Sequence, residues 1–555
     1  MINIIQKIII NLRHYINNIE LNLEEWISQS RLRYFPLFVV IFGAIYYIPI
    51  DTFFVPGDSA DNLLSALKIY RGDEFDFNLT LKGPVFPALI ALSYKIFGIS
   101  EHAGMLVVRF FFSLNIIIVY LLATRLFNRF VGMFAALFII SSGLINKWAN
   151  MIMYDTIVPF SFMLVIYISL LAFEKNKRYL FILAGAFLGI VTTIRQDAIL
   201  LFSLPWMVFL FCNEYRYSKI FYNNLLFSLC FIIPVALFII FLNSIGYGFF
   251  SFMGTVATKG LGVENQSQNY FLVTLNSMIH QSFTSIPRFL DMSEKFTGIK
   301  PLLSYPWIVI IFMFIIRRDN GNRFLLFSLI IFFPLIVFTA QIFRIGRAAP
   351  IYDLVYIALS ASIFYLSIFT VKLIELIYKK IGNRVNPLRL IYDKFKELFP
   401  DRTKSAALII IFVLLCVIVF NVEKKKSKLW ERQTIIKFIM KPSSCFVCKR
   451  EGGNTIKKAT DWILRTLPIN SQIVALGQHT YIAFRLMEKF IMKPWVYGDY
   501  PTKKNMELIA AGDLDYIAVC INQRTLWNLF EKRIWTDKIF ENGYVRVYKI
   551  NNSNR

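Results

Sequence analysis

Gly57-Asp58-Ser59-Ala60-Asp61 opens a polar segment that runs to Lys82-Gly83-Pro84 and separates the first two hydrophobic stretches of this 555-residue chain. The segment brings carboxylates and a cation next to apolar sequence, but it is not apolar enough to cross a bilayer itself. We interpret it as part of the first extracytoplasmic loop of a multispan membrane protein, residues 51–104. The polar groups on which function depends are expected there.

The composition requires a lipid environment. Hydrophobic residues make up 57% of the chain and aromatic residues 17%, and the mean hydropathy is +0.56, which is more apolar surface than a water-soluble core can bury. A formal net charge of +25 would suggest nucleic acid for a soluble protein. Here the cations lie between hydrophobic runs, where they orient spans and meet anionic lipid. We therefore expect membrane lipids as partners and no nucleic acid.

The hydrophobic runs predict an α-helical polytopic protein with about eleven spans. Residues 1–33 are expected to form an amphipathic segment on the cytoplasmic face, because the apolar run Ile8–Ile10 is too short for the core of a signal peptide. The membrane domain is expected over residues 34–421. Its candidate spans are 34–50, 105–121, 130–145, 156–173, 179–193, 198–212, 225–242, 307–316, 324–340, 351–371 and 406–420.

Lysine and arginine recur in alternate connections between these spans, and they predict the orientation. The basic connections are expected on the cytoplasmic side of an inner or plasma membrane, together with the N-terminus. They contain Arg125 and Arg129, residues 175–178, Arg216 and Lys219, residues 317–323, and residues 372–404. The segments 51–104, 147–155, 243–305 and 341–350 and the whole C-terminal tail are then extracytoplasmic.

The C-terminal tail differs in composition from the membrane domain. Residues 422–470 are expected to be a linker and residues 471–555 a small extracytoplasmic α/β domain, because strand-like and helix-like patterns alternate there. The strand patterns are 473–476, 495–497, 516–520 and 544–548, separated by helical patterns at 481–488, 503–511 and 525–532. Cys445 and Cys448 form a lone Cys-x-x-Cys. A zinc site needs a second pair, so a local disulfide or two free thiols is favoured.

Apolar residues between Leu63 and Tyr70 recur at helical spacing, which predicts a short amphipathic helix lying on the membrane. Asp58 then has two interpretations. It caps the N-terminus of this helix, with Asp61 favoured in the first turn by the helix dipole, or it serves as a general base at the lipid-water boundary. The two are compatible, because a capping position also fixes a carboxylate in space.

A family resemblance rests on an ordered set of residues. The set is Asp58, Gly72-Asp73, Lys82-Gly83-Pro84, Tyr94-Lys95-Ile96-Phe97-Gly98, Arg109, Met153-Tyr154-Asp155 and Thr192-Thr193-Ile194-Arg195. It resembles the GT-C type glycosyltransferases, in particular the protein O-mannosyltransferase and aminoarabinose transferase superfamily, over residues 35–212. The resemblance implies a membrane enzyme that moves a sugar from a polyprenyl-phosphate donor to an extracytoplasmic acceptor, which is a protein, a lipid or a cell-envelope glycan.

The same resemblance implies roles for individual residues. Asp58 matches the catalytic aspartate of the first loop, which deprotonates the acceptor, and Asp155 matches the acidic residue of the second loop. Lys82 falls where a lysine contacts the lipid-linked phosphate. The family frequently has an Asp-Glu pair where this chain has Ser59 after Asp58. It therefore stays open whether Asp61 replaces the missing carboxylate, and whether a divalent metal takes part.

Three arginines are further candidates for phosphate binding, because guanidinium groups stabilise the charge that grows on a departing phosphate. They are Arg195, Arg344 and Arg347. Each has a structural alternative: Arg195 as an interfacial anchor paired with Asp197, and the other two as loop cations at the interface. Asp155 has one as well, as N-cap of the fourth span.

A transporter or flippase of an anionic lipid or solute is the alternative function, with the same charges forming a translocation path. Such proteins more often have repeated halves, broken helices and charges at mid-bilayer. This chain shows no internal repeat, and its notable charges lie at the ends of expected spans. The pattern favours an enzyme over a transporter. The resemblance then implies an inverting transferase in which Asp58 removes the acceptor proton and polyprenyl phosphate departs toward the cations.

Overall fold

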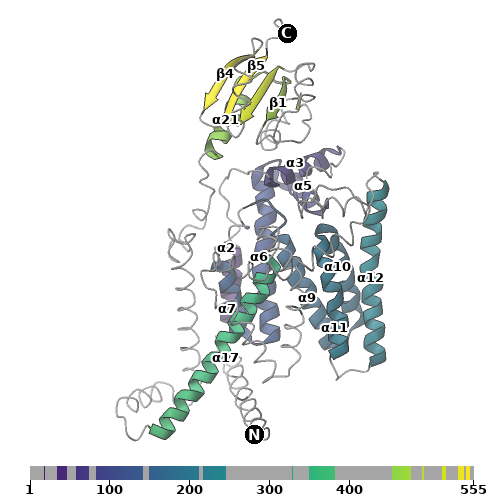
Figure 1. Cartoon of the computed structure of the whole chain (residues 1–555), viewed down its shortest axis with the longest axis vertical. Helices are drawn as coiled ribbons and strands as arrows, with labels where there is room; N and C mark the ends of the chain where they lie inside the picture. Colours follow the sequence, from purple (N-terminus) through teal and green to yellow (C-terminus); the bar gives the residue numbers. More distant parts are fainter. Residues whose placement is uncertain are drawn as a thin grey trace, which may run out of the picture. The chain divides into compact units, whose positions relative to one another are not determined.

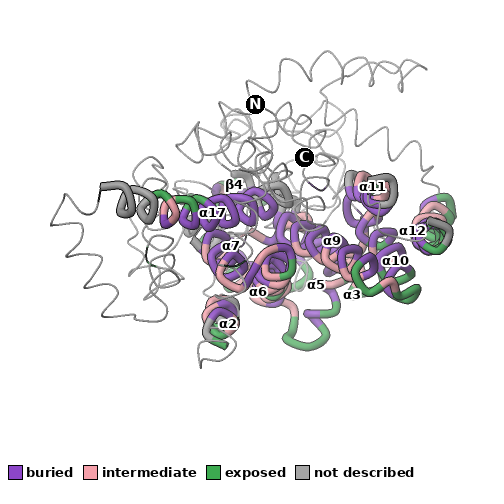
Figure 2. The backbone as a smooth tube through the Cα atoms, turned by 90° about the horizontal axis from the view of Figure 1, so that it is seen from below, coloured by how far each residue is buried: buried purple, intermediate pink, exposed green. Residues whose placement is uncertain are grey.

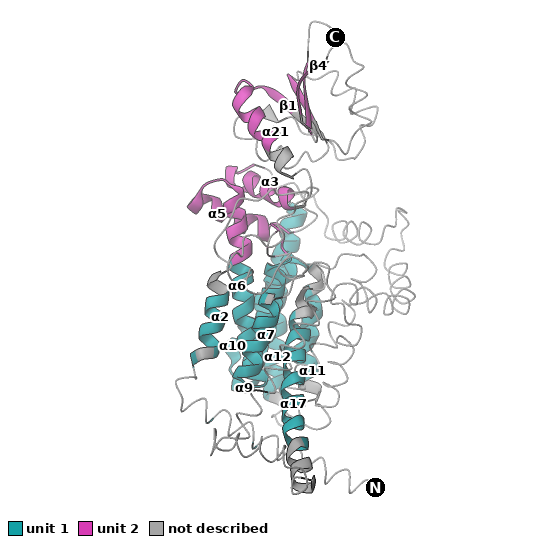
Figure 3. Cartoon of the chain, turned by 90° about the vertical axis from the view of Figure 1, so that its left-hand side faces the viewer, with its two compact units in different colours: residues 1–48, 110–148, 155–440 teal, residues 49–109, 149–154, 441–555 magenta. Residues whose placement is uncertain are grey.

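The structure is a computed structural model of the full chain. It describes residues 34–46, 58–73, 83–141, 149, 151–211, 217–244, 349–381, 453–476, 491–492, 515–520, 536–542 and 545–550, and four single residues, Asn18, Glu25, Ser328 and Ile410. The chain divides into two units (Figure 3). Unit 1 comprises residues 1–48, 110–148 and 155–440, and unit 2 comprises residues 49–109, 149–154 and 441–555.

Unit 1 is helical (Figure 1). Its described elements are α2 (Phe35–Tyr46), most of α6 (Glu101–Leu126), α7 (Arg129–Ser141), α9 (Ile157–Lys175), α10 (Arg178–Ile194), the 3-10 helix η2 (Gln196–Phe202), α11 (Ser203–Phe211), α12 (Tyr217–Ser244) and α17 (Ala349–Ile381). Four stretches of the described residues are long and apolar enough to cross a membrane: Glu101–Leu126, Ile157–Lys175, Lys219–Ser244 and Asp353–Leu373.

The expected spans can be compared with these helices. The spans predicted between residues 34 and 242, and the one at 351–371, each coincide with described helices, although 198–212 is divided between η2 and α11. The helices at 129–140, 178–194 and 198–208 are apolar but shorter than a full crossing. The predicted spans 307–316, 324–340 and 406–420 lie almost entirely outside the described residues, so the expected count stays a prediction.

Local chemistry explains several of the helix ends. Asn128 precedes α7, and its side-chain oxygen accepts a hydrogen bond of 3.0 Å from the backbone N–H of Val131, which is an N-cap interaction. Asn176 follows α9 with a φ of 47°, in the left-handed region that asparagine tolerates better than most residues. These two asparagines help to turn the chain between successive helices of unit 1.

The helices α10 and α12 pack in parallel at very short range. Methyl groups added at Gly185 and Gly189 would lie 2.2 Å from the carbonyl oxygen of Phe227 and 2.6 Å from that of Phe231, respectively. Both pairs advance in the same direction along the two helices, so the helices run parallel. The small residues let the backbones approach, as is common between helices in membranes. Figure 2 shows that α12 exposes much of its length while α9 is largely buried.

Unit 2 contains two short helices from the first loop. α3 (Asp58–Arg71) packs against α5 (Val85–Phe97), and α5 leads through Gly98 into the first turns of α6. Gly98 has a φ of 80°, which glycine adopts without strain, and it ends α5. Ser100 then accepts a hydrogen bond of 3.2 Å from the N–H of Ala103 at the start of α6. The chain is thereby redirected within three residues.

The C-terminal part of unit 2 holds a five-stranded mixed sheet of order β2-β1-β3-β5-β4. The strands are β1 (Gln472–Leu476), β2 (Ile491–Met492), β3 (Tyr516–Cys520), β4 (Thr536–Asn542) and β5 (Val545–Ile550). β1 pairs in parallel with β2 and β3, whereas β5 runs antiparallel to β3 and β4. Three strands, β1, β3 and β5, agree with the predicted patterns, whereas β2 and β4 were not expected. The predicted strand 495–497 and the three helical patterns lie outside the described residues.

The helix α21 (Gly453–Thr466) precedes the sheet and packs on β4 and β5. The rings of Trp462 on α21 and Phe540 on β4 are stacked with their centroids 4.4 Å apart. Ala459 and Ile463 are fully buried on the same side of the helix. Part of the stretch expected as a linker is therefore a helix packed on the sheet.

Candidate active site

α3 begins at Asp58, as the sequence pattern predicts, and Asp61 lies in its first turn. The expectation that this helix lies on the membrane by its apolar stripe is wrong. Leu63 and Leu67 are fully buried and Leu64 is nearly so, because the stripe packs against α5 rather than facing lipid. The helix that carries the candidate base is therefore fixed by protein contacts.

Two hydrogen bonds fix the geometry of this part of unit 2. Tyr94 on α5 donates from its hydroxyl to the carbonyl oxygen of Leu63 on α3, at 3.3 Å. Ser93 donates to the carbonyl oxygen of Ala103 on α6, at 2.7 Å. Burial, with a smaller contribution from Glu101, raises the pKa of the Tyr94 hydroxyl, so it remains a hydrogen-bond donor.

A third hydrogen bond connects α3 to the second loop. The side-chain amide of Asn62 donates to the carbonyl oxygen of Ile152 at 3.0 Å, and both residues are buried. Gly104 on α6 lies at the same junction, where an added methyl group would meet the side chains of Leu63 at 2.6 Å and Ile152 at 3.2 Å. Asn62 follows Asp58 by one helical turn, and Ile152 precedes Asp155 by three residues.

Asp155 is buried, with 4% of its surface exposed, and lies in the turn before α9. Its expected role as N-cap of that helix is not what the structure shows. Thr156 occupies the N-cap position and makes no side-chain capping bond. Asp155 is thus a buried carboxylate one residue before the N-cap position of α9.

Arg195 lies where α10 ends and η2 begins. Its backbone is extended, with φ −149° and ψ 116°, and its N–H bonds to the carbonyl oxygen of Val191 at 2.9 Å. Thr192 and Thr193 precede it, and their hydroxyls donate to backbone carbonyls of the same helix. The side chain is buried, with 5% exposed. A buried side chain does not fit an anchor that reaches out to the membrane surface.

The remaining predicted site residues lie outside what the structure describes. They are Lys82, Arg344, Arg347 and the side chains of Asp58 and Asp197, as well as Cys445 and Cys448. The structure therefore joins the helix that begins at Asp58 with the segment leading to Asp155, through the bond from Asn62 to Ile152. Roles for the outlying cations stay predictions.

Among the described residues, no group of three or more histidine, cysteine, aspartate or glutamate side chains is arranged to hold a metal ion. The question of a divalent metal beside Asp58 and Asp61 is not decided by this, because the side chain of Asp58 lies outside the described part.

Sequence reasoning missed two buried polar features. One is Asn62. The sequence feature that could have revealed it is a carboxamide side chain next to the leucines that α3 buries. The other is Asp353 in α17, fully buried, to which Asn115 of α6 donates a hydrogen bond of 2.9 Å. A carboxylate within the apolar run 351–371 is a visible signal, since ionisable residues inside spans are rare and are usually functional.

Comparison with known proteins gives one family match. Residues 81–239 match the family model described as dolichyl-phosphate-mannose-protein mannosyltransferase. No curated protein matches the sequence.

Solved structures show the same fold. The chain resembles the crystal structure of ArnT from Cupriavidus metallidurans bound to undecaprenyl phosphate, with a TM-score of 0.58 and 12% identity, over 94% of this chain and 98% of that one. The apo state of ArnT gives a TM-score of 0.57 with 13% identity over the same shares. The oligosaccharyltransferase AglB from Archaeoglobus fulgidus, in complex with an inhibitory peptide and a dolichol-phosphate, gives 0.49 and 12%, over 89% of this chain and 70% of that one. The predicted resemblance to GT-C type glycosyltransferases is confirmed, by sequence over residues 81–239 and by fold over most of the chain.

Proposed function

We propose that this chain, a GT-C type membrane glycosyltransferase using a polyprenyl-phosphate sugar donor, transfers the sugar to an extracytoplasmic protein, lipid or cell-envelope glycan with inversion at the anomeric carbon. The family match and the ArnT-like fold support the donor class. The membrane domain expected at 34–421 is retained as part of this proposal, and the extracytoplasmic domain is proposed to include α21, which packs on the sheet, as well as residues 471–555.

The hydrogen bond from Asn62 to Ile152 carries the proposal. It ties α3, one turn after Asp58, to a carbonyl three residues before Asp155. Three residues of chain span at most about 11 Å. The bond holds the first-loop helix against the second-loop segment within unit 2, and we propose that Asp58 and Asp155, one from each of these loops, act on the same acceptor.

The reaction follows from the groups proposed for that site. Asp58 accepts the proton of the acceptor hydroxyl or amine, and the acceptor atom attacks the anomeric carbon from the face opposite the leaving group. The bond from the anomeric carbon to the phosphate oxygen breaks, and polyprenyl phosphate leaves with the electron pair. Lys82, Arg195, Arg344 and Arg347 are proposed to stabilise its negative charge, because hydrogen bonds from cations to phosphate are short and strong.

Asp155 is proposed as the second catalytic carboxylate, which holds the acceptor for attack, and Asp61 is proposed as a substrate-binding group. Burial of Asp155 keeps its carboxylate away from bulk water and gives it a defined position. Hydrogen bonds to such a carboxylate are stronger than in water, so the acceptor can be held before attack.

The test uses the purified full-length protein in liposomes that contain a radiolabelled polyprenyl-phosphate sugar. We expect label to move from the lipid to an acceptor supplied as an envelope extract, with release of polyprenyl phosphate. A transporter would instead move the intact lipid-linked sugar between leaflets and leave the bond to phosphate unbroken. Movement of the intact lipid with no bond cleavage would contradict the proposal and support the alternative.

A further inference from the structure

A group of four cations lies at one end of unit 1, where α9 ends and α10 and α12 begin. They are Lys175, Lys177, Arg178 and Lys219, and we call them the basic corner. The side chains of Lys177, Arg178 and Lys219 belong to exposed residues, as does that of Lys175. The corner is accessible from outside the helix bundle.

The basic corner has no acidic counterpart among the described residues. Glu174 is the acidic residue next to it, and Glu174 already forms an ion pair of 2.6 Å with Arg125. In the described parts of the chain, no ion pair involves any of the four cations. The connection 212–216 adds one Glu214 and one Arg216 by sequence, which cancel. The corner therefore carries a local excess of positive charge.

Aromatic rings hold two of these cations in position. The guanidinium carbon of Arg178 lies 5.3 Å from the ring centre of Tyr222 on α12, and the ammonium nitrogen of Lys177 lies 6.0 Å from that of Tyr179. Lys219 precedes Tyr222 by three residues, so both project from the same face of α12. Arg178 is thus held against Tyr222, which limits the positions that its charge can take, and Lys219 lies about one turn before that ring on the same face of α12.

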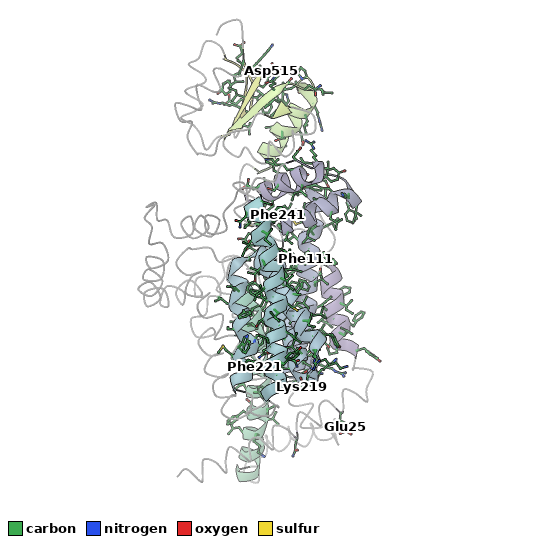
Figure 4. The ribbon with its side chains drawn as sticks, turned by 90° about the vertical axis from the view of Figure 1, so that its right-hand side faces the viewer. Glu25, Phe111, Lys219, Phe221, Phe241 and Asp515 are labelled. Carbon is green, nitrogen blue, oxygen red and sulfur yellow. The ribbon has the colours of Figure 1, made fainter. Side chains whose placement is uncertain are left out.

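The surface that continues from the basic corner is apolar. Tyr222 is 48% exposed and Phe221 is 51% exposed, and Leu225, Leu229 and Ile232 continue the exposed face along α12. Figure 4 shows Lys219 and Phe221 close together near one end of α12 and Phe241 near the other end. Within the span Lys219–Ser244, only 17% of an apolar 18-residue window is buried in the protein. A long apolar helix exposed to this degree is expected to face acyl chains.

We propose that the basic corner is a binding site for an anionic phospholipid, with the phosphodiester of the headgroup between Arg178, Lys177 and Lys219 and an acyl chain along the exposed face of α12. Arg178 lies over the ring of Tyr222, and its planar guanidinium carries N–H groups that can bond two phosphate oxygens. The tyrosines match the headgroup level, where such side chains are enriched. The distribution of basic connections assigns this end of the bundle to the cytoplasmic leaflet.

This site is separate from glycosyl transfer and does not depend on it. A phospholipid bound here would order the connections at the ends of α9, α10 and α12. If no phospholipid binds here, the proposed glycosyl transfer is not contradicted. If the proposed glycosyl transfer is disproved, the lipid site is not contradicted.

The test measures binding of fluorescently labelled phosphatidylglycerol and phosphatidylcholine to the purified full-length protein. Wild type should prefer phosphatidylglycerol. Each cation near an anionic surface contributes about fivefold in affinity, so Lys177→Ala/Arg178→Ala/Lys219→Ala should weaken phosphatidylglycerol binding on the order of a hundredfold. Phosphatidylcholine binding and the elution volume of the protein should not change.

Two further variants separate a built site from general charge attraction. Lys458→Ala/Arg465→Ala/Lys549→Ala removes three exposed cations from α21 and β5 and should leave the preference intact. Arg178→Lys keeps the charge but loses the paired N–H groups, and it should weaken binding severalfold. The proposal is overturned if Lys177→Ala/Arg178→Ala/Lys219→Ala binds phosphatidylglycerol as tightly as wild type. It is also overturned if this variant and the control triple variant lose affinity equally.

Discussion

Asn115 on α6 donates a hydrogen bond of 2.9 Å to Asp353 on α17, and both side chains are buried. The residues are 238 positions apart in the chain, and the bond connects two helices that are each long and apolar enough to span a membrane. Polar side chains in spans are costly unless partnered, so the pair is a specific link between these helices.

Asp353→Ala should therefore destabilise unit 1 by leaving the Asn115 amide without its acceptor. We expect a coupling free energy of about 1 kcal/mol between Asn115→Ala and Asp353→Ala in a double-mutant cycle, as for hydrogen bonds between helices in other membrane proteins. Thermal unfolding of the four proteins in detergent measures it. Ser362→Ala is the control, since its hydroxyl bonds only to Ala358 of its own helix, and additive single effects at 115 and 353 would disprove the link.

Gly185→Ala should disrupt the packing of α10 on α12. The new methyl group would meet the carbonyl oxygen of Phe227 at 2.2 Å, and a backbone atom in a helix cannot move aside without separating the helices. We expect a loss of about 1–3 kcal/mol in the free energy of unfolding.

Gly43→Ala is the matched comparison for that variant. Its methyl group would lie 2.5 Å from the end of the Ile140 side chain, which can adopt another rotamer. Unfolding temperatures should fall more for the substitution at residue 185 than for that at residue 43. The reverse order would show that the short distance between α10 and α12 does not determine stability.

Asn62→Ala should lower turnover, because it removes the bond that ties α3 to Ile152 and leaves that carbonyl buried without its donor. The expected destabilisation is about 1–3 kcal/mol. Ser65→Ala is the control, since Ser65 is equally buried on the same helix and its hydroxyl makes no hydrogen bond within the described structure. Transfer rates for both variants should be compared below their unfolding temperatures, and equal rates would exclude a positioning role for Asn62.

Asp58→Asn should reduce the rate of transfer by about 10²–10⁴-fold while leaving the amount of folded protein unchanged, because the amide cannot accept the acceptor proton. Asp73→Asn is the control from the same loop, since Asp73 is exposed after the end of α3. Single-turnover assays with labelled donor measure both. Wild-type rates for the residue 58 variant would remove this carboxylate from the mechanism.

The C-terminal sheet should respond to acid through Glu541. Hydrogen bonds from Lys538 and from Arg546, at 2.7 Å each, lower the pKa of Glu541 below its ordinary value of 4.5. A depressed pKa stabilises the folded sheet above the unfolded pKa, and this contribution is lost as the pH falls through the folded pKa. Protection factors of the amides in β4 and β5, which correct for the intrinsic exchange rate at each pH, should fall with acid in wild type. Glu541→Gln should exchange faster near neutral pH and show less change on acidification.

Much of this protein follows from the order of its residues. Long apolar runs need a bilayer, so the helices at 101–126, 157–175 and 217–244 were predictable from hydropathy alone. The start of α3 at Asp58 and strands such as β3 follow from local patterns of a few residues. These features depend on neighbours in the chain, and local sequence contains the necessary information.

Contacts between distant residues were decided by the tertiary structure. The leucines of α3 could pack equally well on lipid or on protein, because they are apolar. They face protein because α5 packs against them. Likewise, Asn62 meets Ile152 and Asn115 meets Asp353 because packing brings together residues 90 and 238 positions apart. Hydropathy describes whether a segment prefers lipid or water. A hydrogen-bond partner depends instead on which segments pack together, and local sequence patterns do not specify that pairing.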